Sequence, residues 1–177
     1  ILIVPTAQAG IALVAAALLE PGDHAWAESP GYGGAYVAFK AAGAIVSTMP
    51  LDEQGMTIGS RKDAPRVIFV TPSHQYPTGR LMPIGRRLEL LRYAEAVGAC
   101  IIEDDYDGEF HYEARPVAAL QGLARSPHVF YLGTFSKATY ADIRVGYVVV
   151  PEALIDTFER AQRQMGMLTS VTMQDAL

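Results

Sequence analysis

Short apolar runs alternate with helical patterns along the whole of this 177-residue chain. The run at residues 67–71 is continuous and rich in β-branched residues, which is typical of a strand buried on both faces. Residues 83–97 begin with a proline and then repeat apolar side chains at helical spacing, which indicates an amphipathic helix. Strands and helices that alternate in this way predict an α/β fold, with a mostly parallel sheet flanked by helices on both faces.

The same patterns predict the other elements. Helices are expected at residues 7–20, 32–42 and 151–164, and strands at residues 24–28, 44–49, 99–103, 129–133 and 145–150. Residues 1–4 resemble a strand, whereas residues 51–65 are polar and weakly structured. Because no internal repeat or low-complexity linker interrupts the pattern, we expect a single domain over residues 1–177. The chain opens without methionine and closes within a helical pattern, so we expect it to be a fragment of a longer protein.

The charge and cysteine content restrict the partners and the compartment. The net charge is -5 and the longest basic run is the pair Arg86-Arg87, so this segment lacks the clustered cations that hold nucleic acid. The only cysteine, Cys100, allows no internal disulfide, which favours a reducing compartment such as the cytoplasm. The longest apolar stretch, residues 11–19, is too short to span a bilayer.

Three polar segments follow predicted strands, at the edge where a parallel sheet binds its ligands. They are Thr71-Pro72-Ser73-His74, Asp104-Asp105-Tyr106 and Thr134-Phe135-Ser136-Lys137. Lys137 is one of only three lysines, and a lysine desolvated at this edge can act as an amine nucleophile toward an aldehyde. The alternative is an ordinary surface lysine at a loop tip.

Asp104 and Tyr106 stand two residues apart in an extended segment, so both side chains are expected on one face. An anion and a phenol side by side suit a protonated pyridine nitrogen and the phenolate oxygen next to it. The acidic run from Glu103 to Glu109 also invites a calcium interpretation. An EF-hand loop, however, needs a glutamate six residues after its glycine, and Ala114 occupies that position.

Several residues are candidates to bind a phosphate or a flat ring. Thr6-Ala7-Gln8 leads into a predicted helix, and the free N–H groups of a helix start attract phosphate. Thr134 and Ser136 place hydroxyls on either side of Phe135, and Arg144 supplies a positive charge. Tyr32 follows Pro30-Gly31 at another helix start, where its ring either stacks on a heterocycle or packs in the protein interior.

Taken in order, these segments resemble the fold-type I pyridoxal-phosphate (PLP) proteins of the aminotransferase class I/II superfamily. Within it the chain is most similar to the aminotransferase-like domain of MocR-type regulators of the GntR family. The resemblance covers essentially all 177 residues. Its most specific segments are Thr71-Pro72-Ser73-His74-Gln75-Tyr76-Pro77-Thr78-Gly79, Ile102-Glu103-Asp104-Asp105-Tyr106-Asp107-Gly108-Glu109-Phe110, and Tyr131-Leu132-Gly133-Thr134-Phe135-Ser136-Lys137 with Arg144-Val145-Gly146-Tyr147.

The resemblance implies a role for each candidate. Lys137 would form the Schiff base with PLP, Asp104 would pair with the pyridine nitrogen, Tyr106 would bind the phenolic oxygen, and Tyr32 would stack on the ring. The phosphate would lie among Thr6, Ala7, Gln8, Thr134, Ser136 and Arg144.

Three positions depart from the superfamily pattern. Thr6 stands where a glycine is usual, and Tyr76 replaces the asparagine that binds the ring oxygen in enzymes, as an aromatic residue does in MocR-type proteins. Residues 138–143 lack the proline that is common after the lysine.

Two functions and one inactive state remain open. In a regulator, PLP with a small amino compound acts as effector, and a winged-helix domain outside this chain reads DNA. In an aminotransferase, Lys137 exchanges its bond to PLP for the substrate amine and moves a proton. The third alternative is a domain that has lost its cofactor. The resemblance also implies a homodimer, and a C-terminal small domain outside this chain.

Overall fold

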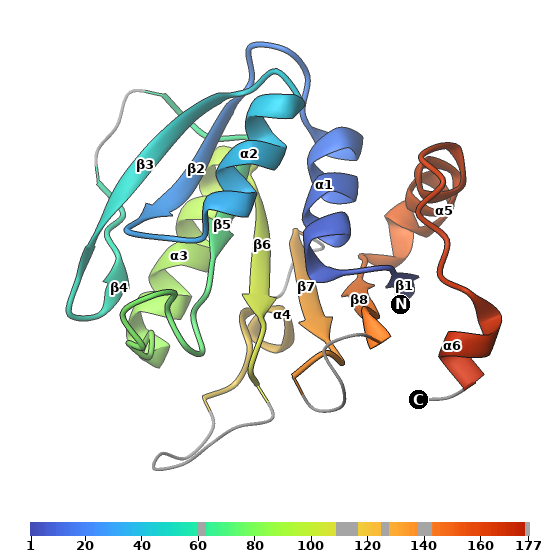
Figure 1. The fold of residues 1–177 in the computed structure, drawn as a ribbon. Helices are drawn as coiled ribbons and strands as arrows, with labels where there is room; N and C mark the ends of the chain where they lie inside the picture. Colours follow the sequence, from blue (N-terminus) through green and yellow to red (C-terminus); the bar gives the residue numbers. More distant parts are fainter. Residues whose placement is uncertain (60–62, 109–116, 125–127, 138–142, 176–177) are drawn as a thin grey trace.

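The computed structural model describes residues 1–59, 63–108, 117–124, 128–137 and 143–175. Within them, an eight-stranded sheet has the order β1-β8-β7-β6-β5-β2-β3-β4. In Figure 1 this sheet runs from β3 and β4 on the left to β8 and β1 on the right. Neighbouring strands are parallel from β3 to β7, whereas β8, β1 and β4 pair antiparallel to their neighbours. The predicted mostly parallel α/β sheet is therefore confirmed.

The strands lie close to the predicted apolar runs. They are β1 (Leu2–Val4), β2 (His24–Ser29), β3 (Ile45–Asp52), β4 (Gly55–Met56), β5 (Val67–Val70), β6 (Cys100–Asp105), β7 (Val129–Thr134) and β8 (Gly146–Val149). All four side chains of β5 are buried, because residues on opposite faces of the strand enter different cores. Val67 and Phe69 pack in one core, whereas Ile68 and Val70 pack in the other.

Helices cover both faces of the sheet. They are α1 (Ala7–Leu18), α2 (Gly33–Ala41), α3 (Ile84–Val97), α4 (Leu120–Leu123), α5 (Ile155–Gln164) and α6 (Val171–Asp175). Helices α1, α2 and α5 bury side chains in the core that contains Phe69, whereas α3 and α4 bury theirs in the core that contains Ile68. Full burial of each large apolar side chain contributes roughly 1.5–3 kcal/mol, so the two cores hold the sheet as the middle layer.

Local signals explain where the helices begin and end. Thr6 caps α1, because its Oγ1 accepts a hydrogen bond from the Ala9 N–H over 3.0 Å. Pro83 precedes α3, and Gly98 ends it in the left-handed conformation with φ 70°, which glycine adopts without strain. Gly10 lets α1 lie close to the sheet, because a Cβ there would stand 2.4 Å from the Leu132 side chain.

The short elements differ from the prediction. The stretch expected to be weakly structured contains β4, and α4 was not predicted, whereas the helical pattern at the end of the chain corresponds to α6. Elements as short as β4 and α4 show too little periodicity to stand out in the sequence. A 3₁₀ turn, Glu152–Leu154, precedes α5 where a continuous helix was expected. No helix in the described ranges is both long and apolar enough to cross a membrane.

Candidate functional site

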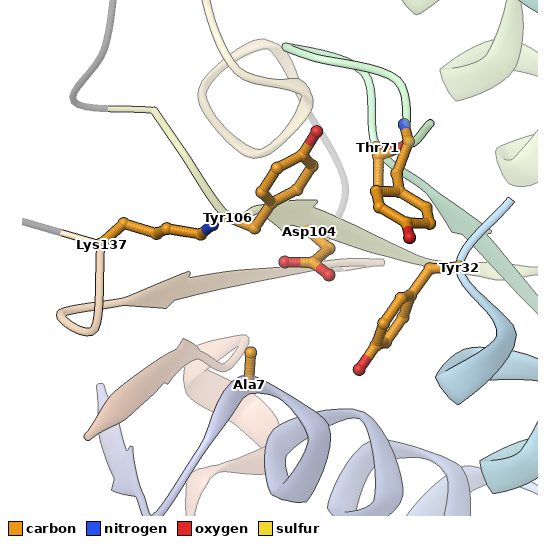
Figure 2. Close-up of a pocket in the computed structure, with 7 residues that line it drawn as sticks. Ala7, Tyr32, Thr71, Asp104, Tyr106 and Lys137 are labelled. Atoms are coloured by element: carbon orange, nitrogen blue, oxygen red, sulfur yellow. The ribbon is translucent and has the colours of Figure 1, made fainter. Parts of the chain in front are cut away.

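A pocket of about 260 Å³ lies at the carboxyl ends of the parallel strands. Among the described residues it is lined by Ala7, Tyr32, Thr71, Tyr76, Asp104, Tyr106 and Lys137. Figure 2 shows the Lys137 side chain extended toward Tyr106 and Asp104, with Ala7 at the start of α1. Six of the eleven residues predicted for the site therefore come together around one cavity, although they are spread over 131 positions from 7 to 137.

Asp104 is a buried acid with no partner in the described part of the chain. Its side chain lies on β6 and is 5% exposed, and its Oδ1 makes no hydrogen bond there. Burial, and after it the nearby carboxylates Asp105, Glu28 and Asp107, raise the pKa of Asp104 to about 7. An acid in this setting is suited to a ligand that brings its own positive charge and N–H donor, and a protonated pyridine nitrogen is such a group.

Three tyrosines form an aromatic wall around the pocket. The Tyr76 ring stands edge-on to Tyr32, with centroids 6.0 Å apart, and edge-on to Tyr106, with centroids 6.2 Å apart. Burial and then the charge of Asp107 raise the pKa of Tyr106 to about 12, and burial also raises the pKa of Tyr32. Both hydroxyls therefore stay protonated near neutral pH and remain available as hydrogen-bond donors to a ligand.

The start of α1 forms another side of the pocket. Ala7 lines the cavity, whereas the Gln8 side chain does not, because its Nε2 donates to the Gly34 carbonyl over 3.0 Å. Gly146 packs tightly here, since a Cβ on it would lie 3.1 Å from the Ala7 nitrogen. Because Gly146 pairs with Thr134, this close approach brings the end of β7 beside the start of α1.

The remaining predicted phosphate residues do not line the pocket. The Thr134 Oγ1 accepts from the Ser136 N–H over 3.2 Å and contacts the Val145 carbonyl at 3.5 Å. Arg144 is exposed and has a positive φ of 47°. Thr6 uses its hydroxyl as the cap of α1. A phosphate role for these residues stays a prediction.

A buried polar network behind the pocket was not predicted from the sequence. Glu28, at the end of β2, accepts hydrogen bonds at its Oε2 from Thr71 and from Gln75. All three side chains are almost completely buried. The available signal was an acidic residue at the end of a predicted strand, at the same sheet edge as Asp104.

The acidic segment after β6 engages protein partners. The Tyr131 hydroxyl donates to Asp105 Oδ2 over 2.7 Å, and His74 Nδ1 lies 2.7 Å from Asp107 Oδ2. The position that decides the calcium alternative, Ala114, lies outside the described residues. In the described ranges, no three histidine, cysteine or acidic side chains are grouped as a metal site.

Comparisons with known proteins identify the family. Residues 1–177 match the family described as aminotransferase class I and II. The chain is 41% identical over 178 residues to a protein of Rhizobium meliloti described as a probable rhizopine catabolism regulatory protein, MocR, and the match covers all of this chain and 36% of that protein. It is 34% identical over 163 residues to the 2-aminoadipate transaminase of Thermus thermophilus, covering 87% of this chain and 41% of that protein.

A solved structure shows the same fold. The kynurenine aminotransferase of Pyrococcus horikoshii, crystallised in complex with PMP, superposes with a TM-score of 0.91 at 30% identity and covers 98% of this chain. The chain spans 45% of that protein, so it is less than half as long as any of these three relatives. The predicted resemblance is confirmed: the chain belongs to the aminotransferase class I and II family.

Proposed function

We propose that this chain is the PLP-binding, aminotransferase-like effector domain of a MocR-type regulator of the GntR family. The observation that carries the proposal is Asp104, a buried acid with no hydrogen-bond partner among the described residues, in one pocket with Lys137. The match to the MocR protein over the whole chain favours the regulator, and the complex of the related aminotransferase with PMP supports a cofactor of the pyridoxal class.

Each residue lining the pocket has a defined task in this proposal. When bound, PLP supplies an aldehyde and a ring that withdraws electrons. Asp104 holds the proton on the ring nitrogen, because a carboxylate without another cation is stabilised by that positive charge. Tyr106 would donate a hydrogen bond from its hydroxyl to the phenolic oxygen, and Tyr32 would stack on the ring face. Lys137 would provide the amine that condenses with the aldehyde, whose oxygen leaves as water.

The phosphate subsite is proposed at the start of α1. The N–H groups of Ala7 and Gln8 are free of helical partners there, and the helix dipole favours an anion. Thr6, whose hydroxyl caps α1, borders this subsite through its backbone, and Thr134, Ser136 and Arg144 lie in the segments around the helix start and complete the proposed set. Arg144 must turn toward the pocket to contribute its charge, because its side chain is exposed.

The parts of the regulator outside this chain follow from the same proposal. A DNA-binding domain precedes the effector domain, a small domain follows it, and the intact protein is a cytoplasmic homodimer. A small amino compound enters the pocket beside the cofactor and acts as the effector. An acidic chain without clustered cations agrees with DNA being bound elsewhere in the protein.

The second candidate function is amino-group transfer. The identity to the 2-aminoadipate transaminase and the likeness to the kynurenine aminotransferase favour it. The residues around the pocket serve both functions. A regulator and an aminotransferase each need a lysine that binds the cofactor and can be replaced on it by an incoming amine.

Borohydride trapping of PLP tests the cofactor proposal. The full-length protein is incubated with PLP and reduced, and the modified peptide is located by mass spectrometry. We expect the label on Lys137 and none in the Lys137→Ala variant, whereas Lys40→Ala, which removes an exposed lysine on α2, should label like wild type. A well-folded wild type without label, or a label on another lysine, would contradict the proposal.

Two further measurements separate regulator from enzyme. The PLP-loaded protein, without borohydride reduction, is offered a panel of amino acids with an oxo-acid acceptor, and DNA binding is measured with and without PLP and each amine. A change in DNA binding without turnover supports the regulator, and turnover without any change in DNA binding supports the aminotransferase.

A further inference from the structure

Tyr76 lines the pocket although the residue is 45% exposed, so it is not obvious what holds its ring in place. Side-chain packing alone gives little restraint on a ring with that much exposure. Its ring meets the two neighbouring tyrosines only edge-on. The restraint therefore has to come from the backbone of the segment after β5.

Both backbone polar atoms of Tyr76 are held by side chains. Its N–H donates to the Thr71 Oγ1 over 3.0 Å, and its carbonyl accepts a hydrogen bond from the Gln75 Nε2. The Gln75 side chain also fixes the next turn, because its Oε1 accepts from the Thr78 N–H and hydroxyl. The peptide groups on either side of the ring are thus fixed by two residues that are themselves buried.

Those two residues share one acceptor, Glu28. The Thr71 hydroxyl donates to Glu28 Oε2 over 2.7 Å and the Thr71 N–H over 3.2 Å, and Gln75 Nε2 donates to the same oxygen over 3.2 Å. The other oxygen, Oε1, is buried without a partner in the described part of the chain. Oε2 accepts all three hydrogen bonds whether or not Oε1 carries a proton, so the geometry does not depend on the charge of the acid.

We infer that Glu28 is the positioning residue for Tyr76, so that a buried acid at the end of β2 sets the wall that an amino compound meets as it enters the pocket. The inference rests on the proposed function for the identity of the ligand, but the contacts that carry it are independent of any ligand. Glu28 touches neither cofactor nor amine in this arrangement. It acts on Tyr76 through Thr71 and Gln75.

Hydrogen exchange tests the positioning without any cofactor. In the full-length protein, the Tyr76 amide should exchange at least about tenfold faster in Glu28→Leu than in wild type. The reason is that Thr71, whose Oγ1 accepts from this amide, loses the acceptor that fixes its own hydroxyl. Glu28→Gln should retain the wild-type rate, because its amide oxygen accepts the same three hydrogen bonds. Unchanged exchange in Glu28→Leu, or equally fast exchange in Glu28→Gln, would overturn the inference.

A double-mutant cycle with PLP tests the consequence for the pocket. Glu28→Leu should weaken PLP binding about tenfold in wild type and by less than about twofold in a Tyr76→Ala background, because the effect passes through Tyr76. The circular dichroism of bound PLP should change in Glu28→Leu and be restored in Glu28→Gln. Equal losses in both backgrounds would show that Glu28 acts on the fold rather than on Tyr76.

A milder variant covers the case in which Glu28→Leu does not fold. Gln75→Met keeps the hydrogen bonds among Glu28, Thr71 and the Tyr76 N–H but removes those of the Gln75 amide, including the one to the Tyr76 carbonyl. It should weaken PLP binding about threefold, again without effect in Tyr76→Ala. Additive losses in this cycle would contradict the inference. A wild type that takes up no PLP would contradict the proposed function alone, since the exchange experiment still decides the role of Glu28.

Discussion

Two consecutive acids on β6 have opposite environments. Glu103 is completely buried and its carboxylate has a full set of partners, namely Arg87 and the backbone N–H groups of Leu120 and Gln121. Asp104, the next residue, is almost as buried, but its Oδ1 has no partner among the described residues. Because successive side chains of a strand point to opposite faces, one acid faces the α3 side and the other faces the pocket.

The difference shows how the chain separates a structural acid from one reserved for a ligand. Burial raises the pKa of both carboxyl groups, but for Glu103 the two backbone donors and Arg87 act against it. For Asp104, Asp105 and Glu28 add to the effect of burial, and no group in the described part of the chain opposes it. Burial of the Asp104 carboxylate without a partner therefore destabilises the cofactor-free fold. A positively charged group that enters the pocket offsets this destabilisation.

The largest effect is expected at the structural acid. Arg87→Met leaves the Glu103 carboxylate buried without its cation and removes donors to the Met82 and Pro72 carbonyls. We expect the free energy of unfolding to fall by about 3–5 kcal/mol, as for other buried pairs that lose one partner. Urea denaturation measures this change.

A paired replacement serves as the control. Arg87→Met combined with Glu103→Leu should cost less than the sum of the two single changes, because the uncompensated charge is gone. If Arg87→Met alone lowers the free energy of unfolding by less than about 1 kcal/mol, Glu103 is not a structural acid that depends on Arg87.

The second effect is a pH dependence of the cofactor-free protein. The pKa values of Asp104 and Glu28 are raised by burial from 3.8 and 4.5 to about 7. Between about pH 4 and pH 7, these two carboxyl groups keep their protons in the folded chain but lose them in the unfolded chain. Their contribution to the free energy of unfolding is therefore largest below about pH 4 and is lost as the pH rises through about 7. The total loss should be a few kcal/mol. Urea unfolding across this range measures it.

Asp104→Asn should remove much of that slope, because the amide does not titrate. Asp52→Asn is the matched control, since Asp52 is half exposed and Arg86 lowers its pKa by a hydrogen bond. A slope that is the same in wild type and Asp104→Asn would mean that Asp104 is solvated or paired in solution.

The sequence predicted the fold and most of the pocket because both depend on local patterns. Apolar runs such as residues 67–71 place the strands, and the sheet topology then brings their ends together, which is why Asp104 and Lys137 share a cavity. The network of Glu28, Thr71 and Gln75 was missed, because it joins residues 43 and 47 positions apart through side-chain hydrogen bonds. The spacing of apolar residues along the sequence does not indicate such contacts. The sequence also did not reveal that Gln8 turns to Gly34.

The third effect concerns the affinity for PLP. Asp104→Asn should weaken PLP binding by roughly 1.5–3 kcal/mol, the range for a hydrogen bond to a charged group, and should leave the cofactor-free fold as stable as wild type or more so at neutral pH. Titration of the absorption of bound PLP measures the affinity. Glu103→Gln should give the reverse, with lower stability and little change in affinity. Both variants behaving alike would remove the distinction between the two acids.

The smallest effect tests the same distinction on a neutral group. Thr6 resembles Glu103 rather than Asp104, because its hydroxyl is already engaged by the Ala9 N–H at the start of α1. Thr6→Gly should therefore cost only about 0.3 kcal/mol of stability and Thr6→Ala about 1 kcal/mol, the usual values for an N-cap. PLP affinity should stay within about twofold of wild type, which corresponds to less than about 0.5 kcal/mol. A loss of affinity that exceeds the loss of stability in Thr6→Gly would instead mean that the Thr6 hydroxyl leaves the Ala9 N–H to bind the phosphate. The hydroxyl would then serve both the fold and the ligand.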